Sequence, residues 1–261
     1  IPAAAAGLAG LVKLGQLADL PEAPAPRIEP APVDPAVFRN EFHAKQALAA
    51  AGIPVPRETV VTSADEAVAT ARATGYPVVL KAAAPTLRHA GGTTGVRIDL
   101  QDAAAIRAAW ASLTDRLAPL ESQEFLVQRM ATPGVMTRIT ADEDPLFGPV
   151  ISFSIAGLPA DLLGDIAYRI PPLTDVDVSE LISATKASPV LHGHRGATPV
   201  HRAALADLIA RVSVLADDMP EIASLVLNPA NAHPGGVEVL GVEITVAPPA
   251  RRTDPGRRAL T

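Results

Sequence analysis

The residues best suited to chemistry lie within residues 75–100. An apolar run at 77–80 ends in Lys81, and a short loop then carries His89 and the glycine-rich sequence GGTTG before a second apolar run. An ammonium group supplies a compact positive charge, and glycines let backbone N–H groups approach an oxyanion closely. The pattern indicates either a site for a phosphate ligand or a plain hairpin with glycines at its tip. It is not a P-loop, because no Gly-Lys-Ser/Thr sequence opens a helix here.

Two other groups of polar residues have types and spacing that could do chemistry. His192 and His194 are spaced as metal ligands can be, but no carboxylate or thiolate is placed to complete a metal site. The acidic run at 142–144 precedes a proline, which favours a solvated turn over a pair of catalytic carboxylates.

Composition excludes several classes of protein. The 261 residues are 48% hydrophobic and 19% charged, enough for a sizeable core in one large domain or two lobes. The net charge of -6, without any Lys/Arg-rich run, argues against nucleic-acid binding. No apolar run reaches the roughly 18 residues of a membrane span. Cysteine is absent, so disulfides and thiolate metal sites are excluded. We expect a cytoplasmic protein that contacts neither nucleic acid nor membrane.

The elements that must position these residues follow a proline-rich linker at residues 21–35. Residues 1–20 read as one helix, the domain as 36–247, and the tail 248–261 as disordered. Hydrophobic spacing and caps predict helices at 38–51, 63–75, 102–117, 177–186 and 200–217. Strands are predicted at 58–62, on both sides of the Lys81 loop, and at 125–130, 136–140, 150–155, 224–227 and 237–246. Helices and strands mix without strict βαβ alternation, which predicts an α+β fold with two sheets.

Several segments, in order, resemble the ATP-grasp domain of ADP-forming acyl-CoA synthetases. They are AGIPVPRETVVTSADEAVATARATGYPVVLKA, FLVQRM, DPLFGPVISFSIAG, SPVLHGHRG and LVLNPA. The resemblance covers about residues 36–247. It implies a two-lobed fold, with lobes at about 36–127 and 128–247 and a nucleotide site between two sheets. Two phrases, LLGDIAYRIPPLTD and LADDMPEIA, are similar to bacterial proteins in which a GNAT acetyltransferase is fused to a CoA-ligase-like region. Residues 1–20 would then end that region.

The resemblance implies roles for individual residues and the cofactors ATP or ADP. Lys81 matches the strand lysine that contacts nucleotide phosphates. Gln128 and Met130 match the hinge strand that holds adenine, and Gly157 belongs to the glycine-rich stretch near the phosphates. Asn228 matches a ligand of Mg²⁺, although an Asn before a proline can equally cap a turn.

The resemblance assigns His89 a further role as a phosphoryl relay, against the alternative of an exposed loop histidine. A neutral imidazole suits such a relay, because its charge changes near neutral pH.

The sequence also departs from the family pattern, mostly where acids are expected. The replaced positions are Ala90, Gly91, Gly92, Met136, Ser224, Val226 and Gly241, with Glu243 near the last. Because Mg²⁺ needs hard oxygen ligands, these changes predict a domain that holds metal poorly and has impaired catalysis.

Three hypotheses therefore remain open. An intact domain would belong to an enzyme that makes acyl-CoA, ADP and phosphate from acid, CoA and ATP. A degenerate domain would no longer turn over. It would bind nucleotide, or pack against a fused acetyltransferase as a regulatory or structural domain. A third possibility is a purely structural dimerisation module. We expect a CoA-ligase-like region and a GNAT domain as partners in the same protein, and a homo-oligomer.

Overall fold

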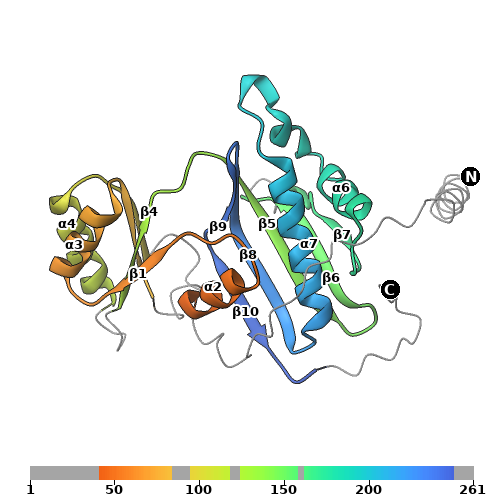
Figure 1. Ribbon diagram of the computed structural model, residues 1–261, viewed down its shortest axis with the longest axis horizontal. Helices are drawn as coiled ribbons and strands as arrows, with labels where there is room; N and C mark the ends of the chain where they lie inside the picture. Colours follow the sequence, from red (N-terminus) through yellow and green to blue (C-terminus); the bar gives the residue numbers. More distant parts are fainter. Residues whose placement is uncertain (1–40, 84–94, 118–123, 158–161, 250–261) are drawn as a thin grey trace, which may run out of the picture.

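The chain forms two lobes joined by a short linker (Figure 1). This computed structural model describes residues 41–83, 95–117, 124–157 and 162–249. The predictions for residues 1–40, for the loop with His89 and for residues 250–261 lie outside these ranges. Within them, no helix is long and apolar enough to cross a membrane.

The smaller lobe is an antiparallel sheet of four strands in the order β1-β4-β2-β3. Its strands are β1 (Glu58–Val61), β2 (Val78–Ala82), β3 (Val96–Leu100) and β4 (Phe125–Arg129), and its helices are α3 (Ala64–Thr74) and α4 (Ala103–Leu117). Ser63 caps α3 by accepting the backbone N–H of Glu66 at 3.2 Å, as the sequence predicts. The Glu66 carboxylate reaches back to the N–H of Thr62, one residue before the cap.

Strand alternation gives this sheet two different faces. One face packs against α3 and α4 with the buried side chains of Val61, Val78, Leu80, Phe125 and Val127. The other face carries Glu58, Val79 and Gln128, which are directly paired across three strands, and Lys81 two residues further along β2. Glu58, Gln128 and Lys81 therefore lie together on the sheet face away from the helices.

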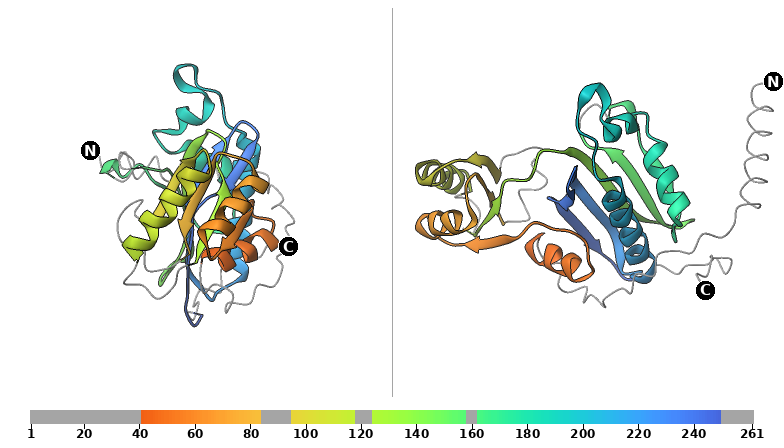
Figure 2. Two further views of the ribbon diagram at one scale, coloured as in Figure 1. Left: turned by 90° about the vertical axis from the view of Figure 1, so that its left-hand side faces the viewer. Right: turned by 45° about the horizontal axis from the view of Figure 1, so that its top comes forward.

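The larger lobe is an antiparallel sheet in the order β10-β8-β5-β6-β7, with β9 paired to β8. Helices α6 and α7 cover one of its faces (Figure 2). The bounds are β5 (Val135–Asp144), β6 (Gly148–Ile155), β7 (Ala167–Arg169), β8 (Ile222–His233), β9 (Gly236–Val239), β10 (Val242–Val246), α6 (Asp175–Ser183) and α7 (Arg202–Asp218), with 3-10 turns η4 (Ser188–His192) and η5 (His194–Gly196).

Several predicted boundaries were wrong in this lobe. The expected strand 237–246 is two strands, because Leu240 and Gly241 both donate their backbone N–H groups to the Pro229 carbonyl and leave the ladder. The acidic run 142–144 belongs to β5, and the turn begins only at Pro145. The short strand β7 was not predicted.

Helix α2 (Glu41–Ala50) connects the two lobes. Its buried side chains Ala44 and Leu48, followed by Ile53, join the hydrophobic core of the larger lobe. The Pro54 carbonyl then accepts the backbone N–H of Val239 at 2.8 Å. The chain therefore packs on the larger sheet before it enters the smaller one.

The linker at residues 130–134 joins β4 to β5 and is fixed at both ends (Figure 1). The Met130 N–H donates to the Pro77 carbonyl at 3.1 Å, and the Asn231 side-chain amide donates to the Thr132 carbonyl at 2.8 Å. A Cβ at Gly134 would lie 2.4 Å from the Ala232 carbonyl oxygen, so the linker passes β8 too closely for a side chain.

Candidate functional site

Lys81 lies near the end of β2 and is almost completely buried. Its ammonium reaches the larger lobe, where it donates to the Leu240 carbonyl at 3.4 Å. The backbone N–H of Asn228 bonds the next carbonyl, that of Gly241, at 2.9 Å. The fold therefore brings the predicted phosphate-binding lysine and the predicted Asn-Pro residue to the same 240–241 turn.

Lys81 belongs to a buried cluster of four charged residues that the sequence analysis did not find. The Glu58 carboxylate contacts both Lys81 and Lys45, at 2.7 Å for Lys45. Glu41 lies 3.2 Å from the Lys45 ammonium and 3.7 Å from that of Lys81. Lys45 also donates to the Leu240 carbonyl, at 2.5 Å. The sequence signal was the i, i+4 spacing of Glu41 and Lys45 on a helix, which is too common to single out.

The cluster shifts the pKa values of its two lysines in opposite directions. For Lys45, burial and the neighbouring Lys81 charge lower the pKa below its ordinary value, against the pull of Glu41 and Glu58. For Lys81, burial acts the same way, but Glu41 and Glu58 outweigh it and raise the pKa. The two carboxylates thus favour the charged form of the buried Lys81, as a phosphate ligand requires.

The other predicted nucleotide residues lie on β4, in the linker and after β6. Gln128 is buried on the sheet face that carries Lys81. Met130 begins the linker, with its backbone N–H already bonded to Pro77. Gly157 is exposed beyond β6, with a positive φ of 121° that favours glycine. Of the three, Gln128 lies directly beside the cluster, through its pairing with Glu58. His89 lies outside the described residues.

The predicted metal position at Asn228 has few charged neighbours. Val226 and Glu243 face each other on β8 and β10, and Thr140 pairs with Val226 from β5. A Cβ at Gly241 would lie 2.1 Å from the Asn228 carbonyl oxygen, so an aspartate cannot occupy position 241 in this backbone. Among the described residues, no group of three or more His, Asp or Glu side chains could hold a metal ion. His192 and His194 lie on η4 and η5, and both are exposed.

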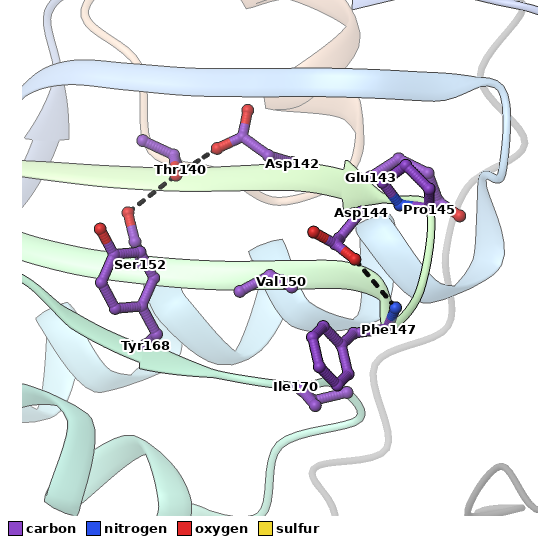
Figure 3. A pocket seen from close by; sticks show the side chains of 10 residues that line it. All are labelled: Thr140, Asp142, Glu143, Asp144, Pro145, Phe147, Val150, Ser152, Tyr168 and Ile170. Atoms are coloured by element: carbon purple, nitrogen blue, oxygen red, sulfur yellow. Dashed lines mark hydrogen bonds between the residues drawn. The ribbon is translucent and has the colours of Figure 1, made fainter.

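A hollow of about 490 Å³ lies on the face of the larger sheet away from α7 (Figure 3). The Asp142 carboxylate accepts hydrogen bonds from the hydroxyls of Thr140 and Ser224, at 2.8 and 2.6 Å. Since the single Thr140 hydrogen goes to Asp142, Ser152 must donate in its 2.8 Å contact with Thr140. The remaining lining residues are Glu143, Asp144, Pro145, Phe147, Val150, Tyr168 and Ile170.

Among the residues that the structure describes, no lysine, arginine or histidine lines this hollow. Carboxylates repel phosphate oxygens, so the hollow is unsuited to a phosphate. The charges that suit a phosphate lie at Lys81 and Lys45.

Comparisons with known proteins agree with this architecture. Residues 35–246 match the sequence family described as the ATP-grasp domain. The beta subunit of ADP-forming acetate–CoA ligase I from Pyrococcus furiosus is 34% identical over 197 residues, which cover 74% of this chain and 85% of that subunit. ADP-forming acetate–CoA ligase I from Archaeoglobus fulgidus is 34% identical over 196 residues, which cover 74% of this chain and 29% of that longer protein.

A solved structure shares the fold as well as the sequence. Dinucleotide-forming acetyl-coenzyme A synthetase 1 of Ca. Korarchaeum cryptofilum, in complex with coenzyme A, Ca-AMPCP and HgCl⁺, aligns with a TM-score of 0.75 and 34% identity. The alignment covers 80% of this chain and 93% of that chain. These findings confirm the resemblance to the ATP-grasp domain of ADP-forming acyl-CoA synthetases and the α+β, two-sheet fold predicted from the sequence. The chain therefore belongs to the ATP-grasp family, as an ATP-grasp domain of the ADP-forming acyl-CoA synthetases.

Proposed function

We propose that this chain binds ATP or ADP between its lobes, as the nucleotide-binding domain of an ADP-forming acyl-CoA synthetase-like protein. The observation that carries the proposal is the buried Lys81 ammonium, which reaches the 240–241 turn of the opposite lobe. A compact cation there is suited to phosphate oxygens. The Korarchaeum relative, which was solved with Ca-AMPCP, supports the same assignment.

The residues present fit a nucleotide. Lys81 would contact a phosphate, and the buried Gln128 amide on the same sheet face offers both a donor and an acceptor to a base. The linker, held by Pro77 and Asn231, would fix the distance between the lobes. The nucleotide would supply the phosphoryl group, and these residues would bind and orient it.

The residues present do not fit a magnesium ion equally well. Around Asn228 the described residues offer one carboxylate, Glu243, while positions 224, 226 and 241 are Ser, Val and Gly. Mg²⁺ is usually held by one or two carboxylates together with phosphate oxygens. We therefore propose that nucleotide binding persists while synthetase turnover is impaired.

Thermal unfolding with and without ATP or ADP tests nucleotide binding. At 100 times the dissociation constant, the ligand should stabilise the protein by about 2.7 kcal/mol. For a chain of this size, that corresponds to a rise in Tm of about 5–10 °C. The rise should disappear in Lys81→Ala and persist in Lys186→Ala, which removes an exposed lysine of the larger lobe. If wild-type protein shows no rise at millimolar nucleotide, the domain is a structural module.

We propose further that a CoA-ligase-like region works with this domain, because the Archaeoglobus relative carries the matching part within a longer chain. The alternative function is a non-catalytic regulatory or structural domain of a GNAT acetyltransferase fusion. The replaced acids favour a non-catalytic role, and the two phrases similar to the fusion proteins suggest the acetyltransferase. Acetyl transfer from acetyl-CoA to protein lysines by the full-length protein would test it, and size-exclusion measurements would test the proposed homo-oligomer.

A further inference from the structure

Glu58 occupies the position where a ligand anion would meet the two buried lysines. It is the first residue of β1, and its side chain is only 2% exposed. Its pairing with Gln128 places it on the sheet face that carries Lys81. The residue therefore faces the proposed nucleotide site and makes its contacts within the molecule.

The contacts of this carboxylate are uneven. One oxygen, Oε1, accepts both Lys45 and Lys81. The other, Oε2, is buried and has no hydrogen-bond partner among the described residues. A buried carboxylate oxygen without a partner costs free energy, so this arrangement is not the most stable one available to a carboxylate alone. The attraction of two ammonium groups to one oxygen holds it there.

The charges of the cluster cancel. Lys45 and Lys81 contribute two positive charges, and Glu41 and Glu58 contribute two negative ones. A phosphate approaching Lys81 therefore meets no net positive charge and must compete with Glu58 for the ammonium. Glu41 competes less, because it lies 3.7 Å from Lys81 and its side chain is nine times as exposed as that of Glu58, at 18% against 2%.

From this arrangement we propose that Glu58 is an internal counter-ion that occupies Lys81 in the nucleotide-free protein and sets the affinity for nucleotide phosphates. The inference rests on the proposed nucleotide site and adds its regulation. Binding replaces the Glu58 carboxylate with a nucleotide phosphate at Lys81. The affinity therefore depends on the difference in free energy between these two ion pairs.

The variant Glu58→Gln tests this by two effects of opposite sign. Without ligand its Tm should fall, because two buried ammonium groups lose a counter-charge. Its affinity for ADP, measured by calorimetry, should nevertheless rise about tenfold, equivalent to about 1.4 kcal/mol. If Glu58 had only a structural role, its replacement would lower both the Tm and the affinity for ADP. Adenosine, which lacks phosphates, should show no gain.

Matched variants separate this effect from general damage. Glu180→Gln removes an exposed partner of Arg169 in the larger lobe and should leave ADP affinity unchanged. Glu58→Asp keeps the charge but shortens the side chain, and should raise the affinity with a smaller loss of stability. If wild type binds ADP and neither Glu58 variant binds it more tightly, the counter-ion role is wrong and the nucleotide site stands. If neither wild type nor Glu58→Gln binds ADP, the proposed function itself fails.

Discussion

At the scale of single residues, Gly241 explains why the turn beside Asn228 carries no acid. The turn donates two backbone N–H groups to the Pro229 carbonyl, which draws it against the opposite strand. No side chain fits at this closest approach, since a Cβ at position 241 would overlap the Asn228 carbonyl oxygen. The backbone here therefore requires glycine at position 241, so an acid could not return there without a change in the turn.

Gly241→Ala should destabilise the protein by about 1–3 kcal/mol, as overpacking against backbone does. The matched control is Gly235→Ala, whose Cβ would meet only the His233 ring at 3.3 Å and should change stability by less than about 0.5 kcal/mol. Chemical denaturation of both variants measures the difference. Equal stabilities would mean that the turn relaxes easily and could have accepted an aspartate.

At the scale of elements, helix α7 carries negative charges at its C-terminal end, where they are unfavourable. Its last residue is Asp218, which follows Asp217 at the helix end that attracts cations. Burial, and then Asp217, raise the pKa of the Asp218 carboxyl above its ordinary value. A carboxyl whose pKa is higher in the folded state favours folding most at low pH, and this contribution is lost as the pH rises through the folded-state pKa.

Asp218→Asn should therefore stabilise the protein at pH 7 by a few tenths of a kcal/mol, the scale of a helix-end charge. At a pH below the unfolded-state pKa, where the wild-type carboxyl is already neutral, the gain should vanish. Urea denaturation at the two pH values measures it. A gain of the same size at both would show that the charge is not its cause.

The elements also show what could be predicted from sequence. Helices α3 and α7 carry their own apolar spacing, and Ser63 marks the start of α3, so both were found. The break at 240–241 was missed because apolar alternation resumes at once from Leu240 to Val246, and the change of phase after Val239 is a weak signal. The partner that ends the ladder, the Pro229 carbonyl, lies on another strand. The partners of Lys81 were missed for the same reason, since Glu41, Lys45 and Glu58 come from two other elements.

At the scale of the whole molecule, lysines and acids gather at two separate places. The lysines gather where α2 and β2 meet the 240–241 turn, whereas the acids gather in the hollow at the far end of β5. A phosphate would be held at the first place and repelled from the second. The position between them is Val226, which pairs with Glu243 on one side and Thr140 on the other.

Val226→Asp tests whether the missing carboxylate is what separates this domain from a metal-dependent one. The new acid would lie beside Glu243, with Asn228 two residues along the strand, which gives the two carboxylates that Mg²⁺ commonly uses. Without metal, the added negative charge should weaken ADP binding. With Mg²⁺, affinity should recover by about tenfold, or about 1.4 kcal/mol.

Calorimetry of ADP binding with Mg²⁺ and with EDTA measures this coupling. The control is Val226→Asn, because asparagine has nearly the same shape as aspartate but no charge. The asparagine variant should resemble wild type and gain little from the metal. Should wild-type protein already gain as much from Mg²⁺ as Val226→Asp, then Asn228 and Glu243 suffice to hold the ion with the phosphates. Impaired turnover would in that case need another cause than the loss of acids on β8.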